Sequence, residues 1–428
     1  MTSEKRTRTV NMEKDMTKLA RGSRQIYLPV EPEEYEWVVQ DRDRFRTFID
    51  TALEQYPELF PPEAAGGYIL HGTLPPAAKM PDLMRRRIKM GGQAYTIMPS
   101  YVLPYLVGTT DEVEDGLLLH QCGVPYWLIA RICGHDDMFW ERLVLRLGRN
   151  SVVGTTIKDP GQLPQDVVAD EKHTRLNGEA VYVATTVGRE CILGASVAHR
   201  ADTAHLTEAY HVFADETQDM DPKYAPATVN LDGWQATHHA WATLFPTIVI
   251  IYCFLHAFLK VYRRGKRSLE PHFATICQRI WDAYHAPTPL QFMSGLVSLE
   301  AWARRTLPAS PARAALLKLC AHAPDFVLAY LYPTARRTSN MLDRHMDWMD
   351  RCFYSAHYFH GHLMTMELAV RGGALLHNFT PYCPRAAIAQ HFISPAHRVN
   401  GFVYHENWLQ NLLVSASRGG FRQTHRKC

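Results

Sequence analysis

The amino-acid sequence predicts a mixed α/β fold, in which a helical block interrupts a sheet and a helical region precedes it. Two observations lead to this prediction. Apolar residues recur with a helical period over residues 112–148 and about 256–335, whereas short strand-like runs with a period of two occupy residues 167–198. Helical and strand patterns then alternate as far as residue 253, as in sheets with helices packed on their faces.

The composition is that of an ordinary globular protein. Of the 428 residues, 46% are hydrophobic and 21% are charged, and the net charge is +3. These values exclude a disordered or low-complexity chain and a strongly basic shell like that of a histone. They still leave room for local basic patches.

The sequence predicts a cytoplasmic protein that has no membrane partner. The nine cysteines lie far apart and no apolar segment follows Met1, a pattern typical of a protein in a reducing compartment. The longest apolar run, residues 247–259, is too short to span a bilayer, which needs roughly 20 residues.

The N-terminal part is expected to contain a tail and a DNA-binding region. Residues 1–26 are rich in lysine and arginine and poor in apolar residues, which favours a flexible basic tail. Residues 27–155 are expected to be mainly helical, with a helix-turn-helix near 112–148 that binds DNA.

This helix-turn-helix is predicted from the positions of glycine, proline and aspartate. Gly123 and Gly134 separate three helical segments, a proline suits the first turn of the second helix, and an aspartate can cap the third. Any three-helix bundle can share this pattern. One side of the third helix would present Arg142, Arg146 and Arg149 to phosphates or base edges.

The sheet and its helical insertion are expected within residues 160–380. Its strands are predicted at 167–170, 180–187, 191–197, 227–231 and 247–253, with helices at 202–218 and 234–244. The helical insertion covers about 256–335, and a further helix begins near Asn340. Residues 381–428 are expected to form a helical region with a basic C-terminal tail.

Acidic residues at strand ends suggest a metal site. Asp170 is expected at the end of the first strand and Asp232 at the end of the fourth, where α/β sheets usually bind ligands. Phosphodiester chemistry with two Mg²⁺ ions needs carboxylates from several elements. Asp343, on the helix near Asn340, is the expected third acid, and Asp347 and Glu300 remain rivals.

Four stretches together resemble a known family. They are Val168-Ala169-Asp170-Glu171-Lys172-His173-Thr174, Asn230-Leu231-Asp232-Gly233-Trp234, Cys253-x-x-His256 and Thr338-Ser339-Asn340-x-x-Asp343. On these residues the chain resembles the RNase H-like catalytic domain of DDE/DDD transposases from bacterial insertion sequences. The resemblance is closest to the Mutator-type group, in which a C-x-x-H precedes the helical insertion.

The resemblance covers roughly residues 160–380 and implies a reaction. Asp170, Asp232 and Asp343 would hold two Mg²⁺ ions, for which Mn²⁺ can substitute, and the enzyme would cut at element ends and join the freed 3′-hydroxyl to target DNA. Two departures stand out: the third acid is aspartate where most relatives have glutamate, and Asp350 stands where some families have lysine.

Cys253 and His256 have a separate interpretation. One cysteine and one histidine cannot complete a tetrahedral zinc site, so a packed thiol beside a hydrogen-bonded imidazole is the expected arrangement. The resemblance implies a structural role at this junction, or contact between the histidine and the scissile DNA end.

Clusters of basic residues suggest a polyanionic partner. An acidic catalytic centre repels DNA unless cations surround it. The residues expected to contact DNA near the acids are Lys260, Arg263, Arg264, Lys266, Arg267, Arg336 and Arg337. Trp281 and Trp302 could stack on a flipped base, but core packing is the expected role for both.

The sequence therefore predicts a DNA transposase that binds double-stranded DNA at element ends and at the target. A homodimer or larger assembly on nucleoid DNA is expected, because two ends must be brought together. Two alternatives stay open: a DNA-binding protein without catalysis, derived from a transposase, and an RNase H-like nuclease without strand transfer. Signatures of nucleotide hydrolases, dinucleotide oxidoreductases, serine hydrolases and zincins are missing.

Overall fold

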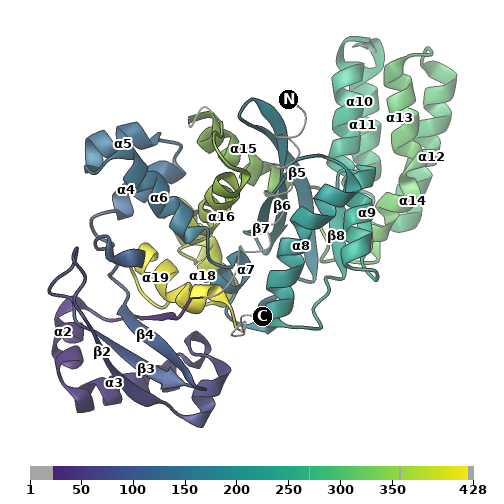
Figure 1. Cartoon of the computed structure of the whole chain (residues 1–428). Coiled ribbons are helices and arrows are strands. Elements are labelled where there is room, and N and C mark those ends of the chain that lie inside the picture. The colour runs from purple at the N-terminus through teal and green to yellow at the C-terminus, as the bar shows by residue number, and fades with distance from the viewer. Residues whose placement is uncertain (1–22, 269, 356–357, 423–428) are drawn as a thin grey trace, which may run out of the picture.

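The computed structural model describes residues 23–268, 270–355 and 358–422. Figure 1 shows three parts in a row: a four-stranded sheet with its helices at one end, a five-stranded sheet covered by helices in the middle, and a helical block at the other end. The predicted mixture of sheet and helical parts is confirmed at this level.

The five-stranded sheet contains the predicted strands. Its members are β5 (Asp166–Leu176), β6 (Glu179–Gly188), β7 (Cys191–Ala198), β8 (Thr228–Leu231) and β9 (Val249–Tyr252). The order is β7-β6-β5-β8-β9. β6 is antiparallel to both of its neighbours, β5 and β7, whereas β8 and β9 run parallel to β5.

Helices cover both faces of this sheet. Alternate residues of β5 enter different cores: Val167 and Ala169 pack in the same core as α8 (Thr203–Met220) and α9 (Gln235–Leu244), whereas Val168 packs in the core of the opposite face. On that opposite face lie α15 (Asn340–Ser355) and α16 (Leu363–Phe379). The period-two pattern of β5 thus reflects burial on both faces.

The segment predicted to be a helical insertion is helical. It consists of α10 (Phe254–Ser268), α11 (Glu270–Tyr284), α12 (Pro289–Thr306), α13 (Pro311–Ala321) and α14 (Ala323–Val327). These helices share their own apolar core around Phe254, Phe292 and Leu316. The chain leaves the sheet after β9 and returns to it at α15 (Figure 1).

The first part of the N-terminal region differs from the expectation of a helical region. It contains a four-stranded sheet of order β1-β4-β3-β2, in which β1 runs parallel to β4. The strands are β1 (Gln25–Leu28), β2 (Ile69–Leu74), β3 (Arg85–Met90) and β4 (Gln93–Pro99). Two helices, α2 (Pro32–Gln40) and α3 (Arg42–Gln55), follow β1.

The expectation of a mainly helical region was wrong because the hairpin of β3 and β4 was not recognised in the sequence. Gly91 and Gly92 have φ angles of +53° and +81° and form the two-residue turn between β3 and β4, and such turns favour glycine. The arginines of β3 obscured the alternation in which Ile88 and Met90 are buried. β1 also begins at Gln25, inside the predicted tail 1–26, and residues 1–22 lie outside the described part of the chain.

The three helices expected at 112–148 are present. They are α4 (Glu114–Gln121), α5 (Tyr126–Cys133) and α6 (Asp137–Leu147), and the short α7 (Val152–Thr156) follows. The Asp136 side chain accepts a hydrogen bond from the backbone N of Phe139 at 2.6 Å and caps α6. The buried side of α6 includes Trp140 and Val144 and packs against α16.

The C-terminal region is part of the core, which corrects the expectation of a basic tail. After α17 (Pro384–Gln390) and α18 (Pro395–Asn400), the wholly buried α19 (Trp408–Ser415) packs beside β1. The buried Arg418 donates from Nη1 to the Phe60 carbonyl at 2.8 Å. These buried contacts join the C-terminal segment to the N-terminal sheet. Residues 423–428 lie outside the described part.

Among the described residues, no helix is both long enough and apolar enough to cross a membrane.

Candidate metal centre

Asp170 lies inside β5, just beyond the point where β8 stops pairing with that strand. The parallel register ends at Val168 and Asn230, whereas β5 continues to Leu176 alongside β6. The expectation that Asp170 ends its strand was therefore wrong, because the hairpin with β6 extends β5 past it. The Asp170 side chain is 18% exposed.

Asp232 follows β8 directly, as predicted. Its Oδ1 accepts a hydrogen bond from the backbone N of Trp234 at 2.7 Å, and this bond shapes the turn that leads into α9. The neighbouring strand is tied to the same place, because the backbone N of Cys253 donates to the Leu231 carbonyl at 2.6 Å. The ends of β8 and β9 therefore lie side by side.

Asp343 lies in the first turn of α15 and is held by Ser339. The Ser339 Oγ donates to Asp343 Oδ2 at 3.2 Å, and the backbone N of Asp343 donates to the Ser339 carbonyl at 2.9 Å. A serine just before a helix is a common start signal. Here the same residue also orients the functional carboxylate.

Cys253 and His256 connect the start of α10 to the start of α15. The backbone N of Ser339 donates to Cys253 Sγ at 3.2 Å, and His256 Nδ1 lies 3.4 Å from Ser339 Oγ. The other imidazole nitrogen, Nε2, lies 3.9 Å from Asp170 Oδ2. The buried thiol thus packs at the junction, as expected, while the imidazole is directed at the acids.

These contacts bring together a group with the spacing of metal ligands. One ligand atom from each of Asp170, His256 and Asp343 lies within 4.8 Å of the other two. The three residues come from β5, α10 and α15, which are far apart in the sequence. Two carboxylates and one imidazole are a donor set that divalent cations accept.

The structure also distinguishes between the candidates for the third acid. Asp343 joins Asp170, whereas Asp347 is exposed one turn further along α15 and Glu300 on α12 forms an ion pair with Arg304 at 2.6 Å. Asp232 is outside the group of three, but its charge affects the pKa values of Asp170 and His256. All three predicted acids therefore lie in one region.

Burial shifts the titration of this group. It raises the pKa of Asp170 to about 6, and the charges of Asp232 and Asp343 add to the rise while His256 opposes it. Burial also raises the pKa of Asp343, against the effects of His256 and Ser339. Burial alone would lower the pKa of His256, but Cys253, Asp170 and Asp232 outweigh it and the net pKa is raised.

Glu171 is a buried acid beside the site that sequence reasoning did not single out. Its Oε1 accepts hydrogen bonds from the hydroxyls of Tyr210 and Thr237, both at 2.8 Å. Burial raises its pKa to about 7, although these two hydrogen bonds oppose the rise. Because Glu171 follows Asp170 in a strand, it points to the opposite face and ties β5 to α8 and α9.

The basic residues of α10 follow His256 along the same helix. Lys260, Arg263, Arg264 and Lys266 are exposed, and Lys266 Nζ lies 5.8 Å from the centre of the Tyr262 ring. The side chain of Arg267 lies outside the described part. Arg336 is also exposed, while its backbone carbonyl accepts a hydrogen bond from Asn230 Nδ2 at 2.9 Å.

Arg337 has a packing role. Its guanidinium lies 4.3 Å from the centre of the Tyr284 ring and 4.6 Å from that of Tyr330. Trp281 and Trp302 are partly buried in the same helical block, as expected of core residues. A contact between Arg337 and DNA stays a prediction, but the residue is already engaged by aromatic rings.

Two of the three predicted arginines, Arg142 and Arg146, lie on α6, and Arg149 follows just after the end of this helix. Arg142 and Arg149 are exposed, and their charges act on the half-buried Arg146. The guanidinium of Arg146 lies 5.0 Å from the centre of the Tyr105 ring. The opposite side of α6 is buried against α16, and Arg142 and Arg149 remain accessible to a partner.

No protein-family model matches the chain, and no curated protein matches it in sequence.

Proposed function

We propose that the chain is a metal-dependent DNA transposase with an RNase H-like catalytic domain. The main observation in favour is the meeting of Asp170, His256 and Asp343, within 4.8 Å, beside Asp232. Each acid lies on or directly after an element that the resemblance to DDE/DDD transposases implies, and that resemblance includes a C-x-x-H at the position of Cys253 and His256.

The topology supports the same proposal. Three antiparallel strands followed by two parallel strands, with a helical block between β9 and α15, are the arrangement that the resemblance implies. The carboxyl end of β8 pairs with Val168 of β5, so the loop after β8 and the part of β5 just beyond this pair supply acids to one place. This is the crevice in which α/β sheets usually bind ligands.

The donor set fits a divalent cation. Asp170, Asp232 and Asp343 would hold Mg²⁺ through carboxylate oxygens, and the nitrogen of His256 makes Mn²⁺ an acceptable substitute. When bound, two such ions would activate the attacking oxygen and stabilise the leaving one. The chain itself would position the DNA end: in a site where only the carboxylates bind the ions, His256, with its raised pKa, would instead donate a hydrogen bond to a phosphate oxygen.

Cations on two helices would bind the DNA backbone. The exposed residues of α10, together with Arg336, would contact phosphates near the acids, and the basic side of α6 would bind the element end. We infer that two copies or more assemble on the paired ends, in the cytoplasm on nucleoid DNA.

The test is an end-cleavage and strand-transfer assay. Its substrates are duplexes that cover the DNA flanking the coding sequence, with Mg²⁺ or Mn²⁺ added. Asp343→Asn and Asp232→Asn should reduce turnover to below about 1% of wild type, because each removes a carboxylate required for the metal ions. The matched control is Asp347→Asn, an exposed aspartate on the same helix, which should stay within about twofold of wild type.

The same assay separates the two alternatives. If the chain only binds DNA, it retains ends with equal affinity with and without Mg²⁺ and cuts nothing. If it is a nuclease without strand transfer, it cuts but fails to join pre-cleaved ends to a target plasmid. Equal activity of Asp343→Asn and Asp347→Asn would refute the assigned metal site.

A further inference from the structure

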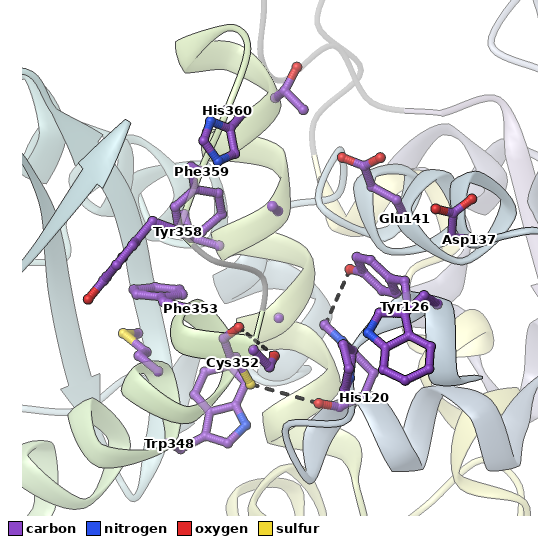
Figure 2. Close-up of a pocket in the computed structure, with 18 residues that line it drawn as sticks. His120, Tyr126, Asp137, Glu141, Trp348, Cys352, Phe353, Tyr358, Phe359 and His360 are labelled. Carbon is purple, nitrogen blue, oxygen red and sulfur yellow. Dashed lines mark hydrogen bonds between the residues drawn. The ribbon is translucent and has the colours of Figure 1, made fainter. Parts of the chain in front are cut away.

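A second site lies away from the acids, in the seam between the three-helix group α4–α6 and the helices α15 and α16. It is a cavity of about 340 Å³. Figure 2 shows Tyr126 on one side of it and Phe353 on the other, with Asp137 and Glu141 of α6 on the same side as Tyr126. A volume of this size is within the range of small-molecule sites.

The walls are aromatic and are held in place without a ligand. The Tyr126 ring stacks on His120, with ring centres 4.8 Å apart, and the Tyr126 hydroxyl lies 3.4 Å from His120 Nε2. On the other side, Phe353 and Phe359 meet edge to face at 4.9 Å. Trp348 is fixed by a hydrogen bond from Nε1 to the Gln121 carbonyl at 3.1 Å. The cavity is therefore pre-formed.

Two carboxylates face this aromatic space. Asp137 and Glu141 are one turn apart on α6 and both line the cavity. Within the described ranges, no lysine or arginine lies within the 4.0 Å that defines an ion pair with either one. Burial raises the pKa of the Tyr126 phenol, and the charge of Glu141 adds to the rise. The Glu141 carboxylate is therefore close enough to the cavity wall to affect the ionisation of Tyr126.

We propose that this cavity binds a small organic cation with a flat, apolar body. The aromatic walls bury the body of such a ligand, and aromatic faces attract a cation that lies over them. Asp137 and Glu141 supply the opposite charge. The same two carboxylates repel phosphates, so the cavity disfavours a nucleotide or the DNA backbone. This proposal does not depend on the catalytic one.

The probe is tryptammonium, and its neutral counterpart is tryptophol, which replaces the ammonium by a hydroxyl on the same indole and ethyl chain. Isothermal titration calorimetry on the full chain should show tryptammonium binding at least tenfold more tightly than tryptophol, a difference of about 1.4 kcal/mol. Glu141→Gln should weaken tryptammonium at least fivefold. The control is Glu54→Gln, an exposed carboxylate on α3 outside the cavity, which should leave the affinity unchanged.

A second variant tests the location. Ala369 on α16 lines the cavity, and Ala369→Phe should fill it and abolish binding of both probes. If that variant does not fold, the tryptammonium affinities of Glu141→Gln and Glu54→Gln are compared to decide whether the cavity is the binding site. The proposal is overturned if tryptammonium shows no binding at millimolar concentration, if tryptophol binds equally well, or if Glu141→Gln binds like wild type.

Discussion

The titration of Asp170 is the residue-scale property that most affects metal binding. A carboxylate must be deprotonated to bind a cation, and burial raises the pKa of Asp170 to about 6. Above pH 6 the residue is available as a ligand, and below it a proton must leave for each ion that binds. Metal binding should therefore weaken on acidification at pH values well above the usual pKa range of an aspartate.

We expect the Mn²⁺ affinity to fall about tenfold for each pH unit below 6, measured by calorimetry between pH 7.5 and 5. If His256 is also a ligand, the affinity should keep rising up to about pH 9, where its raised pKa lies. Glu54→Gln, an exposed carboxylate on α3, serves as the control and should give the wild-type profile. An affinity that stays constant from pH 7.5 to 5 would exclude Asp170 as a ligand.

Arg371 is the residue on which the packing between α16 and its neighbours most depends. It is almost fully buried and donates to the Gly148 carbonyl at 3.0 Å, the Asn150 carbonyl at 2.7 Å and Glu216 Oε1 at 2.5 Å. Removing it would leave the buried carboxylate of Glu216 without its cation.

Arg371→Met should lower the free energy of unfolding by about 3–5 kcal/mol, because an unpaired buried charge is costly. The control is Arg398→Met, which breaks a partly exposed pair with Glu190 and should cost about 0–1 kcal/mol. Urea denaturation measures both. Equal effects of the two variants would show that burial of the Arg371 pair has no special importance.

At the scale of elements, three histidines lie in the seam between α4 and the pair α15 and α16. Burial lowers the pKa of His120 to about 4, of His345 to about 3 and of His377 to about 4. The ring centres of His345 and His377 are 4.6 Å apart, so a charge on one also disfavours a charge on the other. The folded protein keeps all three neutral.

The lowered pKa values of these three histidines make the free energy of unfolding depend on pH. The unfolded chain binds these protons near pH 6.5 and the folded chain binds them only near pH 3 to 4, so the unfolded state gains protons as the pH falls through 6.5. These three groups therefore contribute a decrease in the free energy of unfolding from pH 7 to pH 5, whereas Asp170 and Glu171, whose raised pKa values let the folded state take up protons over the same range, oppose it. In urea denaturation, His345→Gln should remove part of the histidine contribution and raise the free energy of unfolding at pH 5 relative to that at pH 7, compared with wild type; an unchanged pH dependence would contradict this account.

Close contacts between α6 and α16 set the position of the basic side of α6. A Cβ added to Gly372 would lie 2.2 Å from the Val144 carbonyl oxygen, and one added to Gly148 would lie 1.9 Å from that of Leu368. Only glycine allows the two helices to approach so closely. The buried side of α6 is thus fixed, and Arg142 and Arg149 are left exposed.

At the scale of the whole molecule, the N-terminal and C-terminal segments of the described chain are hydrogen-bonded to each other. The backbone N of Tyr27 donates to Ser417 Oγ at 2.9 Å, and Ser100 Oγ donates to Gln410 Oε1 at 2.6 Å. Residues of α19 and of the N-terminal sheet share one core with the face of the central sheet that α16 covers. The N-terminal part is therefore packed together with the domain that holds the acids.

This arrangement predicts that a C-terminal core residue matters for the stability of the whole. Leu412→Ala, at a position with 0% exposure, should lower the free energy of unfolding by about 2–5 kcal/mol. The control is Ile388→Ala on α17, 75% exposed, which should change it by less than about 0.5 kcal/mol. If both variants unfold like wild type, residues 408–415 do not belong to the cooperative core.

The sequence by itself determined the elements whose signals are local. The five strands of the central sheet, the helical insertion and the helices α4–α6 follow from periodicity, glycine breaks and a capping aspartate, because these patterns act within a few residues. Local patterns also placed Asp232 at a strand end and Asp343 on a helix, but they could not choose between Asp343, Asp347 and Glu300.

Only the tertiary structure decided which distant residues meet. Asp170, His256 and Asp343 approach one another because β5, α10 and α15 are packed by contacts between residues far apart in the sequence, such as Ser339 with Cys253. Contacts between residues far apart in the sequence also explain why the buried C-terminal segment was expected to be a basic tail. Arg418 belongs to a segment with the basic composition of a tail, but its partners, Phe60 and Ser23, lie 358 and 395 residues before it, and no local pattern encodes such a contact.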